Sequence, residues 1–297
     1  MSLFFLSLRY FSKMHDHKNV STTPPMTPKN KNSAPHKLLT PLPTLIKHLL
    51  KDGSDQNLRL LQRQLKEKHM GSDLVEVEIK GDFAIAFGDV IVGKIDPNIE
   101  NPAKGFLQPP PPHAWPSHEI PFQISNDLPH PERVQIAIDY FHAHTPIRFI
   151  PFDGDSDAIV FEPGEEHCYS YLGKIGGVQP IRLADECGAQ EILHEMMHAL
   201  GFIHEHSRTD RDAYIEINWD NINEQYDLQF EKVPEIYMST VEGTLFDFRS
   251  IMIYKPNFFA LDKSQPTLRA KGHEKINPIV EGLSPLDIER INRIYGM

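Results

Sequence analysis

The stretch from His194 to His204 constrains this chain more than any other part of its sequence, because it has the form His-Glu-x-x-His-x-x-Gly-x-x-His. On a helix, side chains four residues apart leave the same face, so His194 and His198 can hold one metal ion together. Gly201 is suited to end this helix, since glycine tolerates the left-handed conformation of a sharp exit. The chain can then return with His204 as the third ligand. Three protein ligands leave an open position, which is the arrangement of a catalytic zinc site.

Glu195 lies beside the first histidine of this motif and is not needed as a ligand. A carboxylate in that place can take a proton from zinc-bound water and later pass it to the leaving amine of a cleaved peptide. The alternative interpretation is a helix with two partly exposed histidines, because short motifs recur by chance. The offsets of Gly201 and His204 favour the metal site.

The residues after the motif carry a resemblance to a known family. From His204 to Tyr214 the chain fills every fixed position of the pattern H-E-x-x-R-x-D-R-D-x-Y, which is that of the astacin zinc metallopeptidases, a group of metzincins. The turn from Ser250 to Tyr254 is similar to the Met-turn of this family, with Ile253 where histidine is usual. The chain is therefore identified as a bacterial-type member of the family, made as a zymogen.

This resemblance implies the fold and the activity. The implied fold class is α+β: a two-lobed metzincin catalytic domain with a mixed sheet and two helices above a cleft, and an irregular lower lobe with a C-terminal helix. The implied activity is that of a zinc endopeptidase with one Zn²⁺ per chain and a peptide or protein as substrate. The alternative is a zinc-stabilised binding protein without proteolytic activity. The presence of Glu195 and Tyr254 favours the enzyme.

The resemblance also implies roles for three further side chains. Met252 is expected to form a hydrophobic base under the zinc. Tyr254 is expected to contact the zinc at rest and then to stabilise the oxyanion of the tetrahedral intermediate. Glu205 is expected to meet the new N-terminus that activation creates. Arg208 and Arg211, which stand among aspartates, are interpreted as a structural ion-pair cluster.

Cys168 and Cys187 are the only cysteines of the chain. The resemblance implies that they form one of the two family disulfides, while Pro146 and Met297 stand where the other pair of cysteines is usual. Two free buried thiols are the alternative. On the chain-entropy model a disulfide across a loop of this length contributes roughly 3 kcal/mol. A disulfide favours an oxidising compartment.

Charge and hydropathy limit the partners and the location. A formal net charge of −11 argues against a nucleic-acid partner, because phosphates are repelled by an acidic protein. No apolar run reaches the roughly 18 residues of a transmembrane helix. The apolar start from Leu3 to Leu8 is short and has basic residues only after it, which makes it an unconvincing signal peptide. We expect a secreted or otherwise exported protein.

The composition divides the chain into three parts. Residues 1–43 are expected to form a disordered N-terminal segment with a possible targeting role, because residues 12–43 are poor in large apolar side chains and rich in Lys, Asn, Ser, Thr and Pro. Residues 44–104 are expected to form a prosegment, with two helices in residues 44–70 and hairpin-like strands from Ile79 to Ile95. Residues 105–297 are expected to form the catalytic domain, released by cleavage between Lys104 and Gly105.

Prolines between Asp96 and Pro112 predict a linker without regular structure at this boundary. Beyond it, Pro131 is expected to open a helix with its apolar residues on one face. The other elements expected in the catalytic part are strands at residues 158–161 and 178–181, a zinc helix from Asp185 to Leu200 and a closing helix from Pro285 to Tyr295.

The prosegment is expected to inhibit its own catalytic domain. The resemblance implies that a prosegment aspartate, from an F-x-G-D motif, occupies the zinc in the zymogen. The candidate here is Asp89, although Phe87 stands one place later than the family phenylalanine and Ala86 fills its site. Both cysteines lie in the catalytic part, so a carboxylate replaces any prosegment thiolate as ligand. The alternative is that Asp89 belongs to an ordinary turn and that Asp82 blocks the site.

Overall fold

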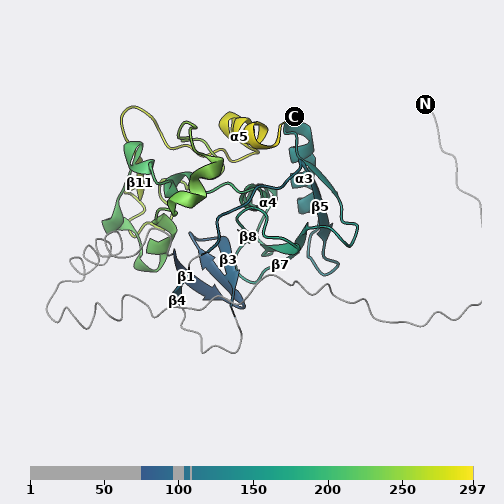
Figure 1. Ribbon diagram of the computed structural model, residues 1–297. Helices are drawn as coiled ribbons and strands as arrows, with labels where there is room; N and C mark the ends of the chain where they lie inside the picture. The colour runs from purple at the N-terminus through teal and green to yellow at the C-terminus, as the bar shows by residue number, and fades with distance from the viewer. Residues whose placement is uncertain (1–74, 96–103, 108, 297) are drawn as a thin grey trace, which may run out of the picture. The chain divides into compact units, whose positions relative to one another are not determined.

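The computed structural model describes residues 75–95, 104–107 and 109–296 (Figure 1). The predictions made for residues 1–43 and for the two helices of residues 44–70 lie outside the described residues. In the part of the chain that the structure describes, a sheet of nine strands has the order β4-β1-β2-β3-β8-β9-β7-β5-β6. In chain order these strands are β1 Val75–Lys80, β2 Phe83–Ala86, β3 Val90–Lys94, β4 Lys104–Leu107, β5 Glu119–Ile124, β6 Arg148–Pro151, β7 Ala158–Pro163, β8 Tyr169–Tyr171 and β9 Val178–Leu183.

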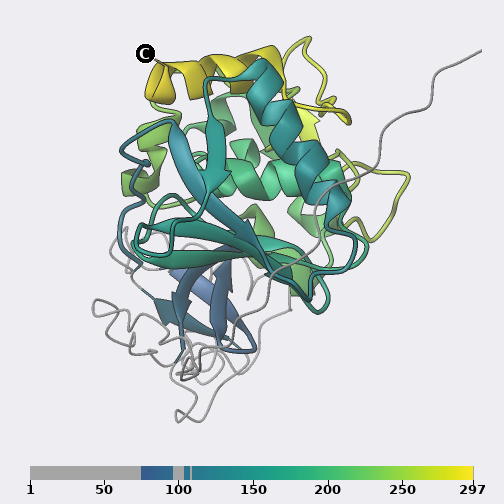
Figure 2. The same cartoon turned by 90° about the vertical axis from the view of Figure 1, so that its right-hand side faces the viewer.

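The half of this sheet that residues 119–183 form, together with the helices, confirms the predicted α+β class. Strands β6, β5, β7 and β9 are parallel to one another, and β8 is antiparallel to β9. Two helices, α3 (Glu132–His144) and α4 (Ala189–Ala199), pack against each other and lie on the same face of the sheet (Figure 2). The predicted apolar face of α3 is buried at Val134, Ile138 and Phe141. The predicted strands at residues 158–161 and 178–181 are confirmed as β7 and β9.

The strands predicted before Ile95 belong to the same sheet. The first three are antiparallel, with turns at Gly81-Asp82 and at Phe87-Gly88-Asp89, as predicted. Strand β3 then pairs in parallel with β8, with Val90 opposite Ser170. An apolar cluster covers this junction, and its members come from both sides: Phe83, Ile85, Ile91, Tyr169 and Tyr171.

Residues 104–107 correct one prediction, because they form strand β4 instead of irregular linker. This strand pairs antiparallel with β1, from Val75 opposite Leu107 to Glu78 opposite Lys104. The run of four prolines begins only at residue 109, so the preceding residues can still donate backbone hydrogen bonds. A neighbouring strand edge therefore imposes the extended conformation here. Residues 96–103 and 108 of the predicted linker lie outside the described residues.

The zinc helix also begins later than predicted, at Ala189 instead of Asp185. Arg133 on α3 donates hydrogen bonds from Nη1 to the carbonyl oxygens of Ala184, Asp185 and Cys187, at 2.8, 2.8 and 2.6 Å. Because these carbonyl groups point toward Arg133, they do not accept the hydrogen bonds of a first α-helical turn, and the helix begins after them. Cys187 forms the predicted disulfide with Cys168, which also fixes this segment before the helix.

The rest of the described chain is irregular until the last helix, as predicted. Helix α5 (Pro285–Tyr295) has the predicted bounds, because Ser284 caps its start by accepting a hydrogen bond from the Asp287 N–H group. None of the helices in the described ranges is long and apolar enough to cross a membrane. The short elements between α4 and α5 are η1 Glu205–Ser207, η2 Arg211–Ala213, β10 Ile215–Ile217, η3 Trp219–Asn221, η4 Glu224–Phe230, η5 Glu235–Thr240 and β11 Leu268–Ala270.

Candidate metal centre

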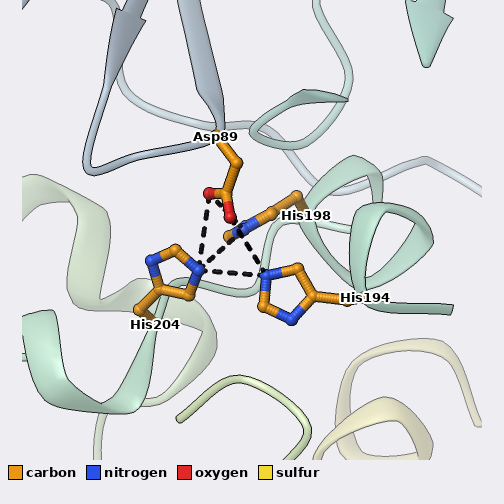
Figure 3. A group of neighbouring side chains, drawn as sticks. All are labelled: Asp89, His194, His198 and His204. Atoms are coloured by element: carbon orange, nitrogen blue, oxygen red, sulfur yellow. Dashed lines mark hydrogen bonds and ion pairs between the residues drawn. The ribbon is translucent and has the colours of Figure 1, made fainter. Parts of the chain in front are cut away.

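Three histidines and one aspartate from distant parts of the sequence meet at one point (Figure 3). One ligand atom from each of Asp89, His194, His198 and His204 lies within 4.8 Å of the others. His204 Nε2 lies 3.0 Å from His194 Nε2 and 3.3 Å from His198 Nε2. The Asp89 carboxylate lies 3.1 Å from Nε2 of His198 and 3.4 Å from Nε2 of the other two histidines. Asp82, the alternative blocking residue, lies exposed in the preceding turn.

Local structure explains how the histidines converge. His194 and His198 are one helical turn apart on α4, so their rings leave the same face. Gly201 follows the helix with φ of +101°, a conformation in which glycine has no Cβ to clash. The chain then reverses and places His204 immediately before η1. Asp89 comes from the turn between β2 and β3.

The hydrogen bonds of the histidines show that this cluster suits a cation. His194 Nδ1 lies 2.9 Å from the Ile251 carbonyl oxygen, and His198 Nδ1 lies 2.8 Å from the Phe202 carbonyl oxygen. A carbonyl oxygen can only accept, so in the neutral rings both Nδ1 atoms carry the proton and both Nε2 atoms present lone pairs. Asp89 adds an ionised carboxylate, whose Oδ1 has no hydrogen-bond partner. Imidazole nitrogens and a carboxylate oxygen therefore point at one another with no hydrogen-bond donor between them. Such a set of ligand atoms fits Zn²⁺.

Burial and neighbouring charges shift the pKa values of these groups in different directions. Burial alone would raise the pKa of the Asp89 carboxyl. The charges of His204 and His198 outweigh burial, so this pKa lies well below its ordinary value. Burial lowers the pKa of His198 to about 4, although the charge of Asp89 opposes this shift. For His194, burial lowers the pKa, but the hydrogen bond and charge of Asp89 outweigh burial and raise it. The carboxylate is thus an anion beside the imidazole nitrogens.

Glu195 is buried on α4 next to the first histidine. Its Oε2 atom has no hydrogen-bond partner. Burial raises the pKa of this carboxyl well above its ordinary value, and the negative charge of Asp89 raises it further. A buried carboxyl group with a free oxygen is costly to a fold, so such a group usually has a chemical use.

Tyr254 packs beside the cluster, but its hydroxyl group is bound elsewhere. The ring lies 5.2 Å from that of His204 and 4.0 Å from that of His206, between centroids. The hydroxyl group donates to Gln229 Oε1 at 3.1 Å. Burial raises the pKa of Tyr254 well above its ordinary value, and the charges of Asp89 and Glu195 add to the shift. Sequence reasoning missed Gln229, because a single glutamine in an irregular segment gives no signal.

A backbone hydrogen bond joins Met252 to Glu205. Met252 is buried, and its carbonyl oxygen accepts the Glu205 N–H group at 2.8 Å. The Glu205 carboxylate is buried between the guanidinium groups of Arg290 and Arg208. Burial raises the pKa of Glu205, although both arginines oppose the shift. Arg290, which sequence reasoning missed, is 85 residues away in the chain.

The predicted ion-pair cluster after the motif is also present. Arg208 pairs with Asp210, with 2.8 Å between Nη2 and Oδ2, and Arg211 pairs with Asp212, with 3.4 Å between Nε and Oδ1. Arg211 Nη1 also donates to the carbonyl oxygens of His206 and Phe230. These contacts fix the segment that follows the third histidine. They support the interpretation that Arg208 and Arg211 have a structural role.

Comparisons with known proteins agree with this geometry. The family model "Astacin", which describes a peptidase family, matches residues 108–296. Zinc metalloproteinase nas-13 of Caenorhabditis elegans is 40% identical over 191 residues, which are 61% of this chain and 41% of nas-13. Zinc metalloproteinase nas-4 of the same organism is 36% identical over 188 residues, 61% of this chain and 59% of nas-4. The chain therefore spans about half the length of these two curated relatives.

Among solved structures, the chain is similar to high choriolytic enzyme 1, a hatching enzyme zinc-protease from the medaka fish Oryzias latipes. The sequence identity is 33% and the TM-score is 0.52. The match covers 59% of this chain and 87% of that one.

Proposed function

Because this chain belongs to the astacin family of zinc metallopeptidases, we propose that it is a zinc-dependent endopeptidase made as a zymogen. The observation that carries the proposal is the convergence of three histidines and Asp89 beside the unpaired oxygen of Glu195. We assign residues 44–104 to the prosegment and residues 105–297 to the catalytic domain. The family match, which begins at residue 108, supports this boundary.

In this proposal, His194, His198 and His204 hold the zinc, and Asp89 is a fourth ligand in the latent form only. When bound, zinc supplies a Lewis acid that polarises the scissile carbonyl group and makes a water molecule more acidic. Glu195 accepts the proton of the attacking water and then donates it to the leaving amine. The unpaired Oε2 of Glu195 supports this role, because it leaves one acceptor free beside the ligands.

Tyr254 is assigned to the stabilisation of the oxyanion. In the uncleaved chain its hydroxyl group is bound to Gln229, and the prosegment loop lies against it at Gly88. Phe87, in the same loop, packs edge-to-face on Tyr237 of the catalytic part, with ring centroids 6.5 Å apart. Removal of this loop opens the space beside the Tyr254 hydroxyl group, which can then leave Gln229 and turn toward the reacting carbonyl oxygen.

The prosegment blocks the edge of the catalytic sheet as well as the metal site. Strand β3 pairs with β8, and the Ser170 N–H group donates to the Asp89 carbonyl oxygen at 3.0 Å. Extended peptides bind proteins by adding a strand to such an edge. The substrate in this proposal is a peptide segment that pairs with β8 once β3 has left. The Cys168–Cys187 disulfide supports export to an oxidising compartment.

The test is a matched pair of variants on α4, both cleaved at the prosegment boundary. Glu195→Gln keeps its zinc, because Glu195 is not a ligand, but loses about 10²–10⁴-fold in turnover of a peptide substrate. Glu191→Gln, one helical turn earlier and exposed, keeps both zinc and turnover. If Glu195→Gln cleaves peptides like the wild type, the assignment of the general base is wrong. If the wild type binds zinc and cleaves nothing, the chain is a zinc-stabilised binding protein.

A further inference from the structure

The three histidine ligands are not held equally. His194 and His198 each donate from Nδ1 to a backbone carbonyl oxygen, which fixes the orientation of the ring. His204 is buried, and its Nδ1 atom has no hydrogen-bond partner. The orientation of His204 must therefore depend on its neighbours in the chain and on the rings beside it.

Its neighbour Glu205 is anchored on both sides. The Glu205 N–H group donates to the Met252 carbonyl oxygen at 2.8 Å. Carboxylate Oε1 accepts from Arg290 Nη1. The other oxygen, Oε2, accepts from the Asp247 N–H group at 3.0 Å and lies 3.4 Å from Arg208 Nη1. A carboxylate with this many partners cannot move without breaking a buried network.

Each nitrogen of the Arg290 guanidinium group donates a hydrogen bond. Arg290 projects from α5 and is 2% exposed. Its Nε donates to Thr244 Oγ1 at 3.1 Å, and its Nη2 donates to the Leu245 carbonyl oxygen at 2.6 Å. A planar guanidinium held at these two points presents its third nitrogen, Nη1, toward Glu205.

We propose that Arg290 is a positioning residue, which fixes Glu205 and through it the zinc ligand His204. This inference rests on the proposed zinc site. In the uncleaved chain, Arg290 and Arg208 already hold the carboxylate that the family resemblance assigns to the ammonium group of a new N-terminus. The site is then complete before cleavage, and the position of the mature N-terminus does not affect zinc binding.

Two further observations describe the surroundings of Glu205 in the uncleaved chain. Arg208 pairs with Asp210 as well as Glu205, so the two guanidinium groups already face two carboxylates. The segment around Trp115 is held by contacts that do not involve Glu205. Trp115 Nε1 donates to the Ala199 carbonyl oxygen at 2.9 Å, and the backbone N–H group of Trp115 donates to Tyr295 Oη at 3.3 Å.

The first experiment compares two arginines of α5 in the uncleaved chain. Arg290→Gln is expected to weaken zinc binding about tenfold in competition with a chelator, in the range for groups that orient metal ligands. It is also expected to change the absorption spectrum of the cobalt-substituted protein. Arg293→Gln removes the same charge from an exposed position of the helix and is expected to change neither. If Arg290→Gln does not fold, Arg290→Lys tests the same contact, with an intermediate loss of affinity.

The second experiment varies the N-terminus. A recognition site for one specific protease is placed at three positions between residues 97 and 108, and the zinc dissociation constants of the three cleaved proteins are compared. The proposal predicts equal constants, and the same weakening by Arg290→Gln in each. Tight binding from one start only, or an Arg290→Gln protein with wild-type affinity and cobalt spectrum, overturns it. A wild-type chain that binds no zinc contradicts the proposed function itself.

Discussion

Gly88, in the turn between β2 and β3, lies directly against the hydroxyl group of Tyr254. A Cβ atom at residue 88 would be 2.6 Å from Tyr254 Oη and 3.1 Å from Gln229 Oε1. Gly88 also has φ of +103°, a conformation that residues with a Cβ rarely adopt. The loop that carries Asp89 therefore requires glycine here both for its backbone and for its approach to Tyr254.

The first prediction follows from this contact. Gly88→Ala is expected to displace the loop and give the uncleaved chain measurable peptidase activity, because Asp89 is the next residue. The measurement is peptide turnover before any cleavage, checked by N-terminal sequencing of the same sample. Gly81→Ala is the control, since Gly81 also has positive φ (+58°) but nothing within 4 Å of an added Cβ. It is expected to lose about 1 kcal/mol of stability and remain silent. Equal activity in both variants would mean that backbone strain alone opens the prosegment.

The second prediction concerns the blocking carboxylate. Asp89→Ala removes one charged ligand and is expected to shift the uncleaved chain toward an open form by roughly tenfold to a hundredfold, because a hydrogen bond to a charged group contributes roughly 1.5–3 kcal/mol. Turnover of a short peptide by the uncleaved protein measures this shift. Asp82→Ala changes the exposed aspartate of the preceding turn and is expected to stay silent. The reverse result, a silent Asp89→Ala and an active Asp82→Ala, would contradict the assignment.

The sequence predicts those parts of the site that local chemistry determines. The predicted bounds of α5 are confirmed, and its start is fixed locally by the Ser284 cap and by Pro285 at its first position. The start of α4 is predicted too early, because the preceding carbonyl groups are held by Arg133 in a distant helix. Strand β4 is missed because its partner strand β1 determines it.

Contacts between distant residues are invisible to spacing rules for the same reason. Spacing brings His194, His198 and His204 together because one helix and one turn carry them all. Nothing local indicates that Arg290 reaches Glu205 or that Gln229 binds the Tyr254 hydroxyl group. These contacts depend on how the irregular segments after α4 pack.

The third prediction concerns the sheet edge that β3 occupies. Release of the prosegment breaks the hydrogen bond from the Ser170 N–H group to the Asp89 carbonyl oxygen. Hydrogen exchange at the Ser170 amide is therefore expected to be slow in the uncleaved chain and fast after cleavage. Amides of β7, which lies between β5 and β9, serve as the internal control and are expected not to change. An equally protected Ser170 in the two forms would show that the prosegment remains bound after cleavage.

The fourth prediction concerns the disulfide. Replacement of both Cys168 and Cys187 by serine is expected to lower the free energy of unfolding by about 2–4 kcal/mol, because the cross-link restricts the unfolded chain and fixes the segment before α4. Urea unfolding of the zinc-loaded proteins measures the change. Wild-type protein with its disulfide reduced is expected to match the double variant. Unchanged unfolding would show that the three carbonyl contacts of Arg133 are sufficient to hold this segment.

The zinc-loaded, uncleaved chain offers the most direct test of the whole account. Crystals of this form, measured at the zinc absorption edge, should give one anomalous peak bonded to Nε2 of His194, His198 and His204 and to an oxygen of Asp89, at about 2.0–2.2 Å. That result would establish the metal, its ligands and the latent state together. A zinc ion bound elsewhere, or bound to the three histidines with Asp89 turned away, would contradict the account.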